Sequence, residues 1–157
     1  MKAALIAIVL LLAGCGFQLQ GRRVMPPVLA TVHLEVIDEQ SDFTRALRAA
    51  LKASGSHLAE VSSADGATVR IKRDELTERV LSVNARNIPT DIELTYKVEV
   101  EVSAAGRELM ALKPFELSRN FSFDERKYLA KEGEKDILRK DLARDMASVV
   151  TRTLSAL

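Results

Sequence analysis

The stretch Asp91-Ile-Glu-Leu-Thr-Tyr-Lys-Val-Glu-Val-Glu-Val102 alternates polar and apolar residues without interruption. Successive side chains of a β-strand point to opposite faces of a sheet, so this period of two predicts a strand with one buried face and one solvated face. The apolar residues from Ile92 to Val102 would all lie on the buried face. No other segment of the chain alternates as clearly, which makes this strand the reference for its neighbours in the sequence.

A strand is predicted on each side of this stretch. Upstream, the alternation over residues 69–83 predicts one long strand, bent or bulged midway, that ends at the break 87–89. Downstream, residues 105–106 supply a hairpin turn, and a further strand over 116–123 follows. Pro114 near the start of that strand indicates an edge or a bulge, because proline has no N–H to donate. The three strands are expected to form an antiparallel meander.

A strand and a helix are predicted before this meander, and a second helix after it. Residues 32–36 alternate like a strand. Ser41 or Asp42 can cap a helix whose apolar positions between 43 and 51 follow helical spacing. A second apolar stripe over 138–157 predicts a long amphipathic helix at the end of the chain.

The resulting order is β-α-β-β-β-α, and each helix has one apolar stripe to bury. We therefore expect an α/β fold of the α+β type: a two-layer sandwich in which a four-stranded mixed sheet carries two helices on one face. The crossover between the first two strands should be right-handed, so that these strands lie parallel. A chain of this size fits one domain, which we expect over residues 29–157.

The beginning of the chain has the pattern of a bacterial lipoprotein signal. Lys2 is followed by the apolar run 3–13 and by the small residues before Cys15, as in a secretory signal with a lipobox. The run is shorter than the roughly 20 apolar residues that a membrane-spanning helix needs. We expect a signal peptide over 1–14 and a lipidated N-terminus and tether over 15–28. The alternative is an ordinary signal peptide with a chance cysteine.

The lone cysteine and the residue after it bear on localisation. One cysteine cannot form an intramolecular disulfide, so acylation is the expected use of Cys15. Several acyl chains give the stable anchoring that one chain cannot. Gly16 stands where a common inner-membrane retention signal has Asp, which favours the outer membrane.

The composition argues against several classes of function. The formal net charge is +1 and aromatic residues make up 4% of the chain, so the basic surface and stacking side chains of nucleic-acid binding are missing. His33 and His57 cannot assemble a usual zinc site, and no phosphate-binding loop or catalytic elbow occurs. We expect no enzyme activity, no metal, and no cofactor apart from the covalent lipid on Cys15.

Topology predicts a local basic patch on this neutral chain. Strands two and four run the same way, so the loops that leave them share one end of the sheet. Arg86 would then lie near Arg126, Lys127 and Lys131. The alternative is that these are solvated loop charges, partly cancelled by neighbouring carboxylates.

Several short motifs, taken in order, resemble those of the LptE family of lipopolysaccharide-assembly lipoproteins. The resemblance covers essentially the whole chain after the signal peptide and includes the strand and helix order. The motifs are Cys15–Gly21, Leu81–Asn84 leading to Arg86-Asn87, Glu93–Tyr96, Phe121–Asp124, Leu129–Glu132 and Glu134–Leu138.

The resemblance implies a non-catalytic lipoprotein of the cell outer membrane, lipid-anchored at the periplasmic face. It would plug the lumen of the LptD β-barrel, help to assemble it, and assist lipopolysaccharide delivery to the outer leaflet. Arg86 and Lys140 match basic positions of the family, and with Lys131, Arg126 and Lys127 they are the candidates for binding lipopolysaccharide phosphates.

Two other functions stay open from the residues alone. A free-standing envelope lipoprotein could bind a lipid or cell-wall ligand without a barrel partner. An unrecognised hydrolase would need a nucleophile and base constellation that the sequence does not offer.

Overall fold

The computed structural model describes residues 25–63, 66–122 and 128–157, with the side chains of 128–132 left undescribed. The signal peptide, Cys15 and most of the tether therefore lie outside the described residues. The elements in chain order are η1 (Pro27–Leu29), β1 (Thr31–Glu35), α2 (Asp42–Ala53), β2 (His57–Ala59), β3 (Ala67–Val83), β4 (Pro89–Ala104), β5 (Arg107–Ser122) and α3 (Tyr128–Leu154).

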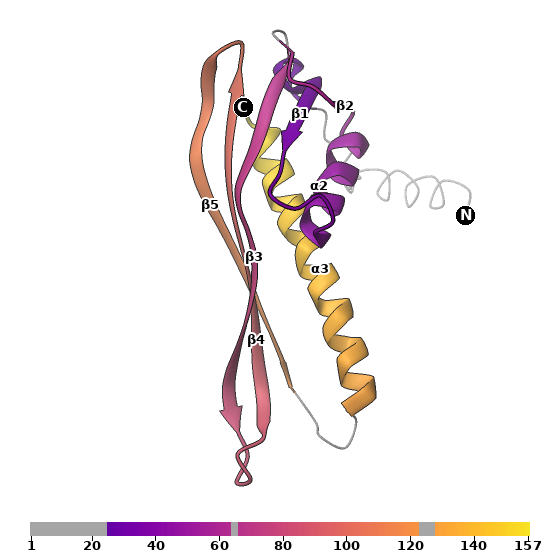
Figure 1. Cartoon of the computed structure of the whole chain (residues 1–157), viewed down its shortest axis with the longest axis vertical. Helices are drawn as coiled ribbons and strands as arrows, with labels where there is room; N and C mark the ends of the chain where they lie inside the picture. Colours follow the sequence, from indigo (N-terminus) through magenta and orange to yellow (C-terminus); the bar gives the residue numbers. More distant parts are fainter. Residues whose placement is uncertain (1–24, 64–65, 123–127) are drawn as a thin grey trace, which may run out of the picture.

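One mixed sheet and two helices make two layers (Figure 1). The strand order is β2-β1-β3-β4-β5, with β1 parallel to β2 and β3, and with β3, β4 and β5 antiparallel. Both helices cover the same face of the sheet, and the described residues place no helix on the opposite face. The α+β sandwich, the parallel first crossover and the meander are thus confirmed.

The sheet has five strands where four were expected. The extra strand, β2, is the three-residue segment His57–Ala59, which pairs in parallel with β1. Three residues are too few to show an alternation in the sequence. They form a strand because β1 lies beside them and pairs with them. Gly55, with a positive φ of 95°, ends α2 and turns the chain back toward this pairing.

Two boundaries also differ from the expectation. β5 starts at Arg107, directly after the hairpin turn, and Pro114 lies inside it opposite Glu99. Because β5 ends the strand order, proline is tolerated there without breaking a second ladder. α3 starts at Tyr128 and runs through Gly133, so the helix is longer than its apolar stripe indicated.

The apolar face of β4 forms the centre of the core, as its alternation predicted. Ile92 and Tyr96 are 6% and 4% exposed, and Leu94 is 1% exposed. Side chains of both helices complete the cluster, namely Phe43, Leu47 and Leu51 from α2 and Leu142, Met146 and Val150 from α3. The ring centroids of Phe43 and Tyr96 lie 6.1 Å apart.

A partly buried polar contact fixes the start of α2 on the sheet. Ser41 caps the helix by accepting the Thr44 N–H at 2.9 Å, and its hydroxyl donates to Asp74 of β3 at 2.5 Å. The Tyr96 hydroxyl donates to the other oxygen of Asp74 at 2.7 Å. Burial and then this carboxylate raise the pKa of Tyr96. The cap residue therefore links α2 to β3 and β4.

The meander is much longer than the rest of the sheet. β3 has 17 residues, a length of about 55 Å at 3.3 Å per residue. β1 pairs only with Ala67–Arg70 of β3, and α2 has 12 residues. Beyond the level at which Leu76 pairs with Tyr96, α3 is the helix that accompanies the ribbon of β3, β4 and β5 (Figure 1). We call the end with the β3–β4 loop, the end of β5 and the start of α3 the distal end.

Candidate functional site

The β3–β4 loop at the distal end is organised by Asn84. Its side-chain oxygen accepts hydrogen bonds from the backbone N–H groups of Arg86 at 2.8 Å and Ile88 at 3.1 Å. The backbone N–H of Asn84 donates to the Ile88 carbonyl at 2.9 Å. Asn87 has a positive φ of 63°, a conformation that asparagine tolerates better than most residues. The loop is thus held by its own hydrogen bonds and presents Arg86 as an exposed side chain.

Asp91 joins the three long strands directly behind this loop. Its carboxylate accepts hydroxyl hydrogen bonds from Ser82 of β3 and, at 3.0 Å, from Ser122 of β5. These hydrogen bonds, that of Ser82 first, hold the pKa of Asp91 below its ordinary value. The distal ends of β3, β4 and β5 therefore lie together, as the shared-end argument predicted.

Ion pairs connect α3 to the distal half of the sheet. Lys135 pairs with Glu78 of β3, and Arg119 of β5 pairs with Asp145. The pairing of Lys135 was not predicted, because Glu78 is far away along the chain. The pairing follows from the observed register, in which Glu78 lies opposite Leu94, so that a carboxylate occupies a position on the helix-covered face of the strand.

Of the five predicted basic residues, Arg86 and Lys140 have side chains that the structure describes. Lys131 lies in the first turns of α3, its side chain is not described, and Arg126 and Lys127 lie outside the described residues. Their proximity to Arg86 stays a prediction. Lys140 is exposed on α3 and donates to Asp136 at 2.6 Å, which lowers the pKa of Asp136.

Arg86 and Lys140 are not neighbours. Lys140 follows Lys135 by five residues, about 8 Å along α3 and away from the distal end. Arg86 lies beyond the end of β3, whereas Glu78, the partner of Lys135, lies well inside the strand. The two cations are therefore separated by roughly 20 Å or more along the long axis, so one phosphate group cannot contact both.

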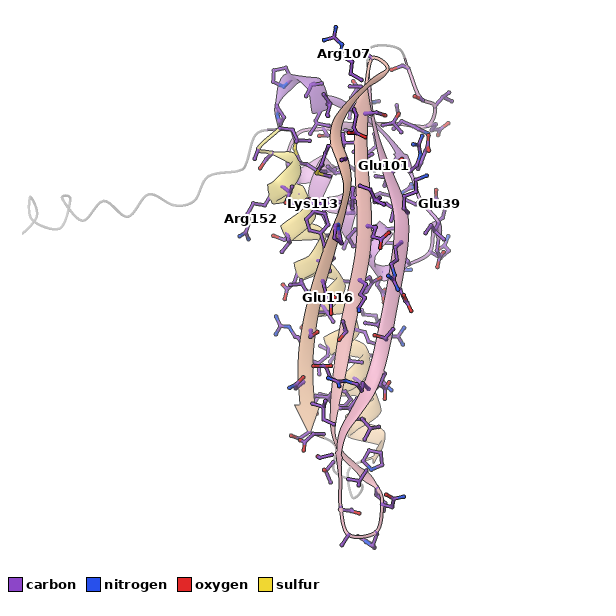
Figure 2. All side chains as sticks on the ribbon, turned by 90° about the vertical axis from the view of Figure 1, so that its left-hand side faces the viewer. Glu39, Glu101, Arg107, Lys113, Glu116 and Arg152 are labelled. Carbon is purple, nitrogen blue, oxygen red and sulfur yellow. The ribbon has the colours of Figure 1, made fainter. Side chains whose placement is uncertain are left out.

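The face of the sheet without helices is charged but internally compensated (Figure 2). Arg70 lies between Glu35 and Glu101, and its hydrogen bonds lower the pKa of both carboxyl groups. Further pairs across neighbouring strands are Arg73–Glu99, Arg79–Glu93 and Lys97–Glu116. Such exposed pairs add little stability, at most about 1 kcal/mol each. Their main effect is a broad polar surface that carries little net charge.

Two open clefts flank α3. One of about 600 Å³ lies between β5 and α3 and contains the Arg119–Asp145 pair together with Arg152. The other, of about 530 Å³, lies between α2 and α3 and is lined mainly by alanines. Neither cleft holds a histidine or a cysteine among its lining residues.

The potential metal ligands of the described ranges do not gather in one place. His33 shares a hydrogen bond of 3.2 Å with the Ala59 carbonyl and so links β1 to β2. No group of at least three His, Cys, Asp or Glu side chains in this part of the chain is placed to hold a metal ion. No helix in it is both long enough and apolar enough to cross a membrane.

Comparison with known families gives one consistent result. The model of the family described as LptE, lipopolysaccharide-assembly, matches residues 29–154. Relatives described as LPS-assembly lipoprotein LptE from Yersinia enterocolitica and Pectobacterium atrosepticum are 28% and 26% identical over 147 residues. These alignments cover 93% of this chain and 70% and 79% of the two relatives.

Solved structures share the fold. The crystal structure of rare lipoprotein B from Shewanella oneidensis has a TM-score of 0.70 and 25% identity, covering 80% of this chain and 94% of that one. The NMR structure of a lipoprotein B from Nitrosomonas europaea has a TM-score of 0.71 and 25% identity, covering 90% and 91%. The agreement extends over nearly the whole length of both neighbours.

Proposed function

Because the chain belongs to the LptE lipopolysaccharide-assembly family, whose model matches residues 29–154, we propose that it is an outer-membrane lipoprotein that plugs and helps to assemble the LptD β-barrel. In this role it assists the delivery of lipopolysaccharide to the outer leaflet and has no catalytic step of its own. The proposal rests on the match to the family model, because the matched residues 29–154 include the strands of the sheet and both helices.

The open face of the sheet supports the plug role. A protein inside a barrel lumen must contact inward-facing residues that are mostly polar. The helix-free face offers paired charges of both signs from the level of Arg70 to that of Arg79 of β3. Contacts of this kind are broad and individually weak, so single substitutions on this face should be tolerated.

The distal end supports lipopolysaccharide binding. Arginine and lysine recognise phosphate through charge-assisted hydrogen bonds. Arg86 lies on a loop fixed by Asn84, and Lys140 lies on α3 in an exposed pair with Asp136. Because the two cations are far apart, they would contact different anionic groups of an extended ligand, with Lys131, Arg126 and Lys127 as further candidates.

The anchor completes the proposal. We expect the lipid on Cys15 to hold the protein in the outer membrane at its periplasmic face. The free-standing envelope lipoprotein remains the second candidate. Neither candidate involves nucleic acid.

Copurification from detergent-solubilised membranes separates these two candidates. Affinity-tagged protein should bring down a large barrel protein in near-stoichiometric amount. A solitary lipoprotein that carries a lipid or a cell-wall fragment would instead support the second candidate.

Lipopolysaccharide binding is tested by charge reversal. Replacing Arg86 and Lys140 together with Glu should weaken binding markedly and leave the circular dichroism spectrum unchanged. Arg107→Glu is the matched control, because Arg107 is exposed at the opposite end of the sheet (Figure 2). Unaltered binding by the double variant, or an equal loss in the control, would place the site elsewhere.

A further inference from the structure

The cleft between α2 and α3 is bounded on its α2 side by a row of alanines. The two helices lie side by side (Figure 1). A solvated helix face normally carries charged or polar side chains, and methyl groups are too short to fill the space against a neighbouring helix. The row therefore leaves an apolar strip of α2 that the described residues do not fully cover. This strip, the alanine stripe, consists of Ala46, Ala49, Ala50 and Ala53.

The α3 side of the cleft contains a buried hydroxyl group. Thr151 lines the cleft and is 6% exposed, and its hydroxyl has no hydrogen-bond partner among the described residues. Buried polar groups are hydrogen-bonded in the great majority of cases. A polypeptide segment in the cleft would bring backbone N–H and C=O groups next to this side chain. The cleft thus suits an occupant that combines apolar side chains with hydrogen-bonding groups.

The chain enters the described domain at the rim of this cleft. The backbone N–H of Met25, the first described residue, donates to the Ser54 carbonyl at 3.4 Å, and Ser54 lines the cleft directly after the alanine stripe. Met25 is 7% exposed, so the start of the domain is packed in place. Residues 15–24 of the tether are therefore joined to the domain at this rim.

The tether has the side chains and the length to occupy the cleft. Its segment Gly16-Phe-Gln-Leu-Gln-Gly21 carries the bulky apolar residues Phe17 and Leu19, and a spacing of two places them on one side of an extended chain. Leu19 precedes Met25 by six residues, a reach of up to about 20 Å. The alanine stripe is about 10 Å long, at 1.5 Å of helix rise per residue. Both side chains can thus reach it.

We propose that residues 16–21 of the tether dock in the cleft between α2 and α3, with Phe17 and Leu19 against the alanine stripe. This contact lies within one chain and needs neither a barrel nor lipopolysaccharide. Cys15 is two residues before Phe17, so docking brings the expected lipid attachment point within about 7 Å of the cleft. The domain would then hold this flank toward the membrane instead of turning freely on its anchor.

Disulfide trapping in intact cells tests where the segment lies. Leu19→Cys is combined with Ala49→Cys in the cleft, or with Lys52→Cys as the matched control. Lys52 is exposed on the same helix and is not among the lining residues of the cleft. After mild oxidation, we expect peptide mass mapping to find position 19 joined to position 49 in clear excess over position 52. Ala49→Cys alone controls for pairing with Cys15.

Trypsin cleavage tests whether docking depends on the apolar contacts. The dibasic site at residues 22–23 follows the segment directly, so docking restricts access of the protease to it. In the purified full-length lipoprotein, replacing Phe17 and Leu19 together with Ser should speed cleavage there by about ten-fold or more, the size expected for two half-buried side chains. Ala49→Glu puts a charge into the cleft on a good helix former and should act in the same direction. Lys52→Glu should leave the rate unchanged.

The possible outcomes separate tether docking from other occupants of the cleft. Equal trapping at positions 49 and 52, or trapping at neither, would overturn the proposal, and so would cleavage rates that do not differ between the variants. Trapping of position 49 with another protein would assign the cleft to a partner instead. All these results leave the proposed function in place, because it does not depend on where the tether lies. The Phe17 and Leu19 variant precedes the described domain, so it keeps the test valid if Ala49→Glu alters the circular dichroism spectrum.

Discussion

Leu94→Asp tests the claim that the alternating strand β4 builds the core. Leu94 is 1% exposed and lies between the cross-strand positions Glu78 of β3 and Arg119 of β5. The substitution removes a fully buried side chain and leaves a carboxylate in its place. The hydrophobic loss alone is typically about 2–5 kcal/mol for a leucine truncated in a core.

The buried charge adds a second cost. The new carboxylate would lie beside Glu78, and its other neighbour Arg119 is already paired with Asp145. Burying the charge there costs several kcal/mol unless the carboxylate takes up a proton or takes Arg119 from Asp145. Single domains are stable by about 5–15 kcal/mol, so the two costs together approach or exceed the whole stability. Leu94→Asp should therefore populate the unfolded state at neutral pH, and Val98→Asp should behave in the same way because Val98 is 0% exposed.

Urea unfolding followed by circular dichroism measures this effect. Leu112→Asp is the control, because it makes the same substitution at a strand leucine that is 49% exposed. We expect the control to lie within about 1 kcal/mol of the unmodified protein. A cooperative transition for Leu94→Asp within 1 kcal/mol of the control, by the same reasoning, would refute the buried-face assignment of β4.

Three further outcomes are expected. Ser41→Ala removes both the cap of α2 and the contact to Asp74, so it should cost about 1–2 kcal/mol in urea unfolding, and a change below a few tenths would argue against the link. Arg70 lowers the pKa of Glu35 and Glu101 from the ordinary value of 4.5, so the stability that it contributes is present above that pH and is lost as the pH falls through the lowered values. The difference in unfolding free energy between Arg70→Met and the unmodified protein should therefore shrink on acidification. A difference that stays constant would contradict the pairing. Cys15→Ala should leave an unanchored or unprocessed protein with an intact domain, and firm retention in the outer membrane of cells lacking the barrel partner would count against lipidation as the anchor.

The sequence was sufficient for the parts of the fold that depend on a long, regular pattern. The alternation from Ile92 to Val102 predicted β4 and its buried face, and the parallel first crossover followed from the right-handed rule. The short strand β2 could not be predicted, because its three residues pair only when β1 is already in place. The early start of α3 was missed because its first half lacks the apolar stripe that marks the second half.

The candidate site was less accessible from the sequence. The strand order predicted that Arg86 lies at the end of the sheet where both β3 and β5 end, and in the structure the two strands do end together there. The pairing of Lys135 with Glu78 joins residues distant in the chain, so no local pattern marks it. The register of β3 shifts between Val80 and Ser82, and such a bulge does not change the alternation enough to be recognised beforehand.

Depletion of the protein in cells tests the central claim most directly. If this chain plugs and assembles the barrel, its loss should lower the amount of correctly assembled barrel protein and leave the outer leaflet poor in lipopolysaccharide. Both quantities are measured on the same cells, by immunoblotting of membrane fractions and by surface labelling of lipopolysaccharide. Normal barrel abundance together with normal surface lipopolysaccharide would contradict the translocon role and favour the free-standing lipoprotein.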